Sequence, residues 1–171
     1  MSKPTISVDF DGVLHSYASG WKGARNITDD PVPGAIDWLC EIQRDYTVAI
    51  SSARSWQWGG RWAMRRWLKR HAAAAFMHAS QRIAMKAEAS DPRPLARLMR
   101  LPGWQPGMDY PEDEADHFAR CFVRNIQFPR TKPSAQLYID DRAHCFTGAF
   151  PDAATIRGFK PWNKTPRAKP A

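Results

Sequence analysis

Apolar and polar positions alternate in the first half of the chain in a pattern that predicts two strands and two helices. Residues 5–10 (TISVDF) place an apolar side chain at every second position, which predicts a strand. Residues 33–45 carry apolar side chains at helical spacing, and 46–50 (YTVAI) form a short apolar run typical of a buried strand. A second helix is predicted over 61–71. Strands that alternate with helices indicate an α/β fold with a parallel sheet.

The second half of the chain predicts one more helix and two short strands. Apolar residues recur at spacings of three and four over 112–124, which predicts a helix. Residues 125–128 and 137–139 are the strand candidates. We therefore expect a parallel sheet flanked by helices.

The length of 171 residues favours a single domain, which we place at residues 1–159. Residues 72–124 fit no core pattern as a whole, so we expect a mostly helical insertion, which is a partial lid, a partner surface or a stabilising extension. Residues 160–171 combine several cations with three prolines, and we expect a basic, flexible tail.

Composition narrows the class of protein. The formal net charge of +8 favours anionic partners such as phosphate esters or nucleic acid. The three cysteines form no C-x-x-C pair, which argues against a disulfide framework and a zinc ribbon. The chain has no apolar run of membrane-spanning length and starts without a secretory pattern, so we expect a cytoplasmic protein with no membrane partner. Its oligomeric state stays open.

Polar side chains lie at the ends of three of the predicted strands. They are Asp9 and Asp11, Ser51 and Ser52, and Asp140 and Asp141. The carboxyl ends of parallel strands line one crevice, so these residues are expected to converge there. Clustered carboxylates repel one another unless a cation lies among them, and oxygen ligands suit Mg²⁺. With Lys132 just before the last strand, the set predicts a site for a phosphoryl group.

The segment Asp9-Phe10-Asp11-Gly12-Val13 resembles the D-x-D-G-[TV] signature of the haloacid dehalogenase (HAD) superfamily of phosphatases. The other marks of that family follow in order: a serine after the second strand, a lysine ahead of the fourth, and paired acids. The resemblance implies a Rossmann-like HAD core. The short stretch between the first two predicted strands leaves room only for a minimal cap.

The resemblance also implies a role for each residue. Asp9 would be the nucleophile that forms an aspartyl-phosphate, and Asp11 the general acid that later activates water. Mg²⁺ would be held by the Asp9 carboxylate, the Asp11 backbone carbonyl and the paired acids. Asp141 is the expected direct ligand, with Asp140 as its supporting neighbour. Lys132 would offset the negative charge of Asp9 and the phosphate.

The serine that binds phosphate is Ser51 or Ser52. Ser52-Ala53-Arg54 resembles the Ser-x-Arg arrangement of end-healing polynucleotide phosphatases, which favours Ser52 and makes Arg54 a candidate phosphate clamp. The alternatives are a turn cap for the serines and a solvated side chain for Arg54. The run at 140–142 resembles the deoxyribonucleotidase branch of the superfamily.

These observations predict a Mg²⁺-dependent phosphomonoesterase that acts on a nucleotide or on a 3′- or 5′-phosphorylated nucleic-acid end. One alternative is a HAD phosphatase of a small sugar or metabolite phosphate. Another class is a non-catalytic nucleic-acid-binding module that uses the Arg- and Trp-rich residues 54–70.

Two features have competing structural interpretations. The Arg- and Trp-rich segment also fits an amphipathic helix that buries Trp62, Met64, Trp67 and Leu68 and exposes cations on its other side. His15, which follows the first motif, is interpreted as a surface-loop histidine, with a substrate contact as the alternative.

Overall fold

A computed structural model of the chain describes residues 2–85 and 111–143, together with residues 156, 158 and 160. The predicted tail beyond residue 160 and the middle of the predicted insertion lie outside the described residues. No helix in the described part of the chain has the length and apolarity needed to cross a bilayer.

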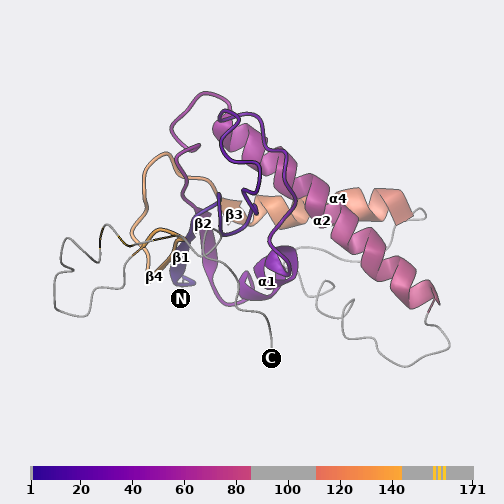
Figure 1. Cartoon of the computed structure of the whole chain (residues 1–171). Coiled ribbons are helices and arrows are strands. Elements are labelled where there is room, and N and C mark those ends of the chain that lie inside the picture. The colour runs from indigo at the N-terminus through magenta and orange to yellow at the C-terminus, as the bar shows by residue number, and fades with distance from the viewer. Residues whose placement is uncertain (1, 86–110, 144–155, 157, 159, 161–171) are drawn as a thin grey trace, which may run out of the picture.

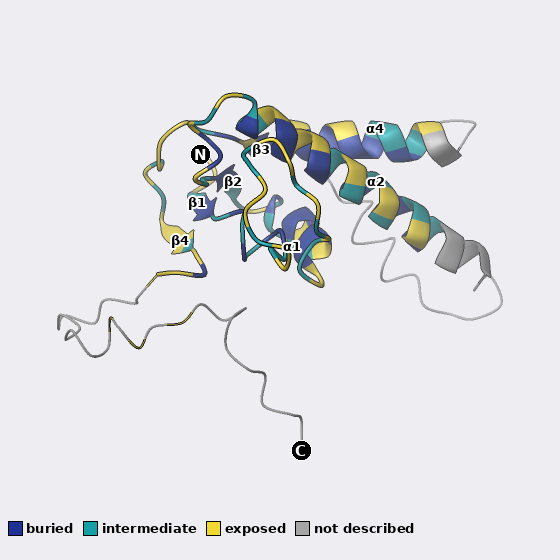
Figure 2. Cartoon of the chain, turned by 45° about the horizontal axis from the view of Figure 1, so that its top comes forward, coloured by how far each residue is buried: buried dark blue, intermediate teal, exposed yellow. Residues whose placement is uncertain are grey.

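Four parallel strands form one sheet, which confirms the α/β class (Figure 1). They are β1 (Thr5–Val8), β2 (Thr47–Ile50), β3 (Ile126–Gln127) and β4 (Leu137–Ile139). Their order across the sheet is β3-β2-β1-β4. The central strands β1 and β2 are almost wholly buried, whereas β4 is a largely exposed edge (Figure 2).

The sheet changes direction beside β1. The chain runs outward from β1 to β2 and β3, then crosses back to place β4 on the other side of β1. In open parallel sheets, ligands bind beyond the carboxyl ends of the strands at such a switch point. Val8 is in register with Ile50 and with Ile139, so the residues that follow these three meet at that edge.

Three helices lie to one side of the sheet in both views (Figures 1 and 2). They are α1 (Ala35–Ile42), α2 (Gly60–Met85) and α4 (Pro111–Arg124). The predicted helices over 33–45 and 112–124 are found with small shifts at their ends. The helix predicted over 61–71 continues much further, because the alanine run at 72–75 has high helix propensity and does not interrupt it.

Helix α2 packs against α4. The rings of Phe76 and Phe118 stack with their centroids 5.1 Å apart, and Lys69 forms an ion pair with Asp116. Both phenylalanines belong to the same buried cluster as the apolar side chains of the sheet. The described parts of the predicted insertion, 72–124, therefore belong to the main hydrophobic core.

We predict that Phe76→Ala lowers the free energy of unfolding by about 3–5 kcal/mol, because it leaves a cavity between two packed helices. Phe76 is 2% exposed. Urea unfolding followed by circular dichroism measures the change. His78→Ala, at an exposed position on the same helix, is the control and should have little effect. Equal stability of both variants would contradict this packing.

Candidate functional site

Three carboxylates meet at the switch point of the sheet. Asp9, Asp140 and Asp141 each offer an oxygen, and these oxygens lie within 4.8 Å of one another. Asp9 follows β1 directly, and its backbone N–H donates to the carbonyl of Ile139 at 2.8 Å, which places it beside Asp140 on the neighbouring strand. The parallel pairing of β1 with β4 therefore builds the cluster.

Asp141 is the most confined member of this cluster. It is 8% exposed, and neither of its carboxylate oxygens has a hydrogen-bond partner among the described residues. The nearest cation is Arg142, whose Nε lies 3.7 Å from Asp141 Oδ2. Burial raises the pKa of Asp141 above its ordinary value. A buried, unpartnered carboxylate is costly, so this position favours a bound cation.

The chain beside Asp141 has no space for a side chain. A Cβ at Gly12 would lie 2.5 Å from Asp141 Oδ2, and Gly12 has a φ of +91°. Both facts require glycine here, because other residues rarely adopt this backbone conformation and would collide with the carboxylate. The glycine of the first motif thus lets Asp141 approach the loop that follows β1.

Asp9 has one oxygen held and one available. The N–H of Phe10 donates to Asp9 Oδ1 at 2.7 Å, while no hydrogen bond to Oδ2 is found among the described residues. Burial raises the pKa of Asp9 to about 7; the Phe10 hydrogen bond lowers it, and the nearby carboxylates of Asp140, Asp11 and Asp141 add to the rise. The only ion pair that the described residues give this cluster is the one between Arg142 and Asp141, so Arg142 offsets only part of its negative charge.

The three carboxylates suit a divalent ion. They offer only oxygen donors, the ligands that Mg²⁺ prefers, and a cation would supply the partner that both Asp141 oxygens lack. It would also remove the mutual repulsion that helps to raise the pKa of Asp9. The residues therefore fit the expected magnesium site, although clustered acids alone do not select one metal.

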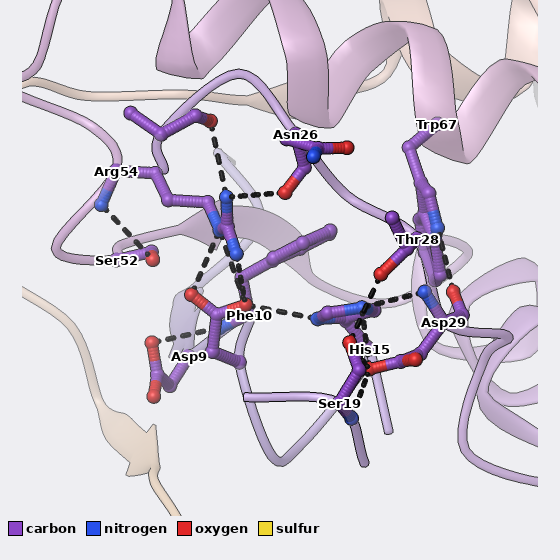
Figure 3. Close-up of polar contacts among 12 residues, drawn as sticks. Asp9, Phe10, His15, Ser19, Asn26, Thr28, Asp29, Ser52, Arg54 and Trp67 are labelled. Atoms are coloured by element: carbon purple, nitrogen blue, oxygen red, sulfur yellow. Dashed lines mark hydrogen bonds and ion pairs between the residues drawn. The ribbon is translucent and has the colours of Figure 1, made fainter. Parts of the chain in front are cut away.

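The carboxylate of Asp11 has different partners, and it is not in the three-acid cluster. Arg54 Nε donates to Asp11 Oδ2 at 2.8 Å, and His15 Nδ1 lies 2.9 Å from Asp11 Oδ1 (Figure 3). Burial by itself would raise the pKa of Asp11, but the hydrogen bonds and charges of His15 and Arg54 outweigh it and hold that pKa below its usual value. Asp11 is thus held as a carboxylate anion.

His15 is 1% exposed, so its interpretation as a surface-loop histidine is wrong. Its ring stacks on Phe10, and its Nε2 accepts the backbone N–H of Asp29 at 3.3 Å. That hydrogen bond assigns the proton of a neutral ring to Nδ1, which then donates to Asp11. Trp67 on α2 supports this loop by donating from Nε1 to the carbonyl of Asp29 at 3.0 Å.

Arg54 is fully buried, and the described structure does not bring it to the acid cluster as a phosphate clamp. Besides its bonds to Asp11, its NH1 group donates to the carbonyls of Gly23 at 2.7 Å and Ala24 at 3.1 Å. Arg54 therefore joins the loop after β1 to the turn after β2. No local signal in the sequence distinguishes this role from a contact with substrate, because its partners come from a distant segment.

The two candidate serines have different positions. The N–H of Ser51 donates to the carbonyl of Val8 at 3.0 Å, so Ser51 lies beside Asp9 at the end of the sheet. The Oγ of Ser52 accepts the backbone N–H of Arg54 at 3.2 Å, as in a turn cap. The backbone of Ser51 thus lies at the same edge as Asp9, while the Ser52 hydroxyl caps the turn, and the choice between the two serines as phosphate ligand stays a prediction.

Lys132 is exposed in the segment between β3 and β4. Its Nζ lies 4.3 Å from the centroid of the Tyr138 ring. No contact between Lys132 and the acid cluster is found within the described residues. Lys132 was expected to offset the negative charge of Asp9, and the described residues do not place it where it could do so.

Comparisons of the chain with protein-family models, with curated proteins and with solved structures found no match. The chemical interpretation of the site therefore rests on its own side chains. They form an acidic cluster at the ends of β1 and β4, in which Arg142 contacts Asp141 from outside, beside a buried Arg54–Asp11–His15 network.

We predict that Asp141→Asn raises the melting temperature of the metal-free protein by several degrees, because it removes one of three crowded carboxylates. The same change should abolish the rise in melting temperature that Mg²⁺ produces in the unmodified protein. Differential scanning fluorimetry with EDTA or Mg²⁺ measures both effects. Asp45→Asn, at an exposed acid, is the control. An undiminished response of the Asp141 variant to Mg²⁺ would exclude the site.

The stabilisation by Mg²⁺ should grow with pH. The raised pKa of Asp9, about 7 against 3.8 for an ordinary aspartate, means that the folded protein retains a proton which the unfolded chain releases. This contribution to stability is complete below pH 3.8 and is lost as the pH rises through about 7. Mg²⁺ must displace that proton, so its effect on the melting temperature should be small at low pH and larger at pH 8. Melting curves across this range test the trend, and a response independent of pH would contradict it.

Proposed function

We propose that this protein is a Mg²⁺-dependent phosphomonoesterase that acts through an aspartyl-phosphate on Asp9. The observation that carries the proposal is the gathering of Asp9, Asp140 and Asp141 at the switch point of the sheet. Asp9 adds a carboxylate oxygen, Oδ2, without a hydrogen bond among the described residues. The resemblance of residues 9–13 to the HAD signature supports the same role for Asp9.

Mg²⁺ would be held by Asp9, Asp140 and Asp141, together with the backbone carbonyl of Asp11 that the resemblance implies. When bound, it would neutralise charge on the phosphoryl group and on the carboxylates that surround it. This compensation matters here because a phosphate dianion would otherwise meet three carboxylates.

The reaction begins when Asp9 Oδ2 attacks phosphorus and forms a new O–P bond. The bond from phosphorus to the leaving oxygen breaks, and its electron pair stays on that oxygen. The leaving oxygen takes a proton from Asp11 when that carboxyl carries one, and from solvent otherwise. Water then attacks phosphorus, Asp11 takes a proton from the water, and the bond to Asp9 breaks to give inorganic phosphate.

The hydrogen-bond partners of Asp11 favour its role as the base in the second step, in which it accepts a proton from water. Arg54 and His15 hold this carboxylate in its anionic form, which suits a base that accepts a proton from water. The first step needs the protonated form, which these contacts disfavour. Substrates whose leaving group needs no protonation should therefore react most readily in the first step.

A nucleotide or a phosphorylated nucleic-acid end is the proposed substrate class. The net charge of +8 draws polyanions toward a site that is itself acidic, so the attraction must come from surfaces around the site. Ser51 lies beside Asp9 and is the proposed donor to a phosphate oxygen. The Arg54 side chain acts by holding Asp11 and not by binding the phosphate.

We predict that Asp9→Asn lowers the release of inorganic phosphate by at least about 10³-fold, because an amide cannot replace the nucleophile. Phosphate release is measured with Mg²⁺ on p-nitrophenyl phosphate, nucleoside monophosphates, sugar phosphates and oligonucleotides phosphorylated at either end. Asp37→Asn, at an exposed acid of α1, is the control and should retain full activity. Equal activity of the two variants would disprove the mechanism, and a preference for sugar phosphates would contradict the proposed substrate class.

A further inference from the structure

Trp62 lies on the outer surface of α2, although an amphipathic helix was expected to bury it. It is 60% exposed, whereas Met64, Trp67 and Leu68 of the same helix are buried as expected. The guanidinium of Arg66 lies 5.3 Å from the centroid of the Trp62 ring. An exposed tryptophan ring beside an arginine can stack on a flat ligand group while the cation meets a negative charge, so its surroundings bear on whether this face binds a ligand.

A groove between α2 and α4 runs beside this tryptophan. Its volume is about 460 Å³, and Trp62 and Val123 line it together with five cations: Arg65, Arg66, Lys69, Arg120 and Arg124. A second hollow of about 220 Å³ lies on the other side of Trp62, between α2 and the loop that contains Arg25. Trp62 and Arg66 line both, so they stand between two basic concavities.

The groove has more positive charge than its acidic neighbours can neutralise. Asp116 pairs with both Lys69 and Arg120. For the other three arginines, no ion pair is found among the described residues. Arg65 lies over the ring of Phe128, Arg66 over Trp62, and Arg124 contacts the sulfur of Cys121. A ligand with several negative charges could form ion pairs with these three arginines.

Further exposed aromatic side chains lie on the segment that leads into α2. Trp56 is 73% exposed and Trp58 is 82% exposed, and the guanidinium of Arg25 lies 4.8 Å from the centroid of the Trp58 ring. This segment follows the carboxyl end of β2, which is the edge of the sheet where Asp9 lies. The aromatic and basic surface therefore begins at the same edge as the acid cluster.

We propose that this surface, defined by Trp62, Arg65, Arg66 and Arg124 with Trp58 and Arg25 beside it, binds single-stranded nucleic acid. Arginines neutralise the phosphates while exposed tryptophan rings stack on unpaired bases, which a duplex does not offer. The further step, in which the bound strand delivers a terminal phosphate to Asp9, rests on the proposed function.

The test measures the fluorescence anisotropy of a labelled 12-nucleotide single strand with the full chain, in EDTA and over a series of salt concentrations. Trp62→Ala should weaken binding about 5- to 100-fold, and Trp62→Phe should restore most of the loss, because a smaller ring still stacks. Arg66→Ala should weaken binding and reduce the dependence on salt by about one phosphate contact. Arg44→Ala is the control: it removes one positive charge from a side chain outside both concavities and should change the affinity little.

Several outcomes would overturn the inference. They are unchanged affinity of Trp62→Ala when its melting temperature matches that of the parent, equal binding of a duplex of the same sequence, and tighter binding of polyglutamate or of vesicles that contain phosphatidylserine. Tighter binding of polyglutamate would assign the surface to an acidic protein, and tighter binding of the vesicles would assign it to a membrane.

The Asp9→Asn variant separates this inference from the proposed function, because it should bind the single strand as tightly as the parent protein. Loss of its strand binding would contradict the separation of the two surfaces. If the parent protein binds the strand but releases no phosphate, only the proposed phosphatase activity is refuted. If the parent protein releases phosphate but does not bind the strand, only the proposed nucleic-acid-binding surface is refuted.

Discussion

The repulsion among three carboxylates at the ends of β1 and β4 is the constraint on which the site depends. Parallel pairing brings Asp9 next to Asp140, and the bare backbone of Gly12 lets Asp141 come close as well. Burial leaves both oxygens of Asp141 without a hydrogen-bond partner among the described residues, and Arg142, at 3.7 Å, is the cation beside it. A divalent cation would relieve this arrangement, and in the mechanism we propose the same cation would allow a phosphate group to approach.

The protein separates its acidic residues into two environments a few positions apart in the chain. Asp9 has no cation among its contacts in the described residues, whereas Asp11 accepts hydrogen bonds from the Arg54 guanidinium and from His15. The two carboxyls consequently have pKa values displaced in opposite directions. Such a difference between neighbouring acids is the physical basis for giving them different chemical roles.

Helix α2 connects the core, the site and the surface. Its second half fills the core through Phe76, while Trp67 holds the loop that carries Asp29 and thereby the orientation of His15. Its first turns present Trp62 and a row of arginines to solvent. The helix begins at the edge of the sheet where the acids meet, so any strand bound along it would pass close to them.

Local sequence pattern determined the α/β class, the strands that carry the acids and the expectation that Asp9, Asp11, Asp140 and Asp141 converge. In the structure the carboxylate of Asp11 turns instead to Arg54 and His15. Period-two alternation and polar strand ends depend only on near neighbours, so they are readable from the chain. The burial of His15 and Arg54, the contacts of Asp11 and the exposure of Trp62 were decided by tertiary structure alone. Each depends on contacts with segments far away in the sequence, such as the carbonyl of Gly23 for Arg54 and helix α4 for the orientation of α2. Helical spacing places Trp62 on the same helix as Trp67, but only the position of the neighbouring elements decides which of the two rings is covered.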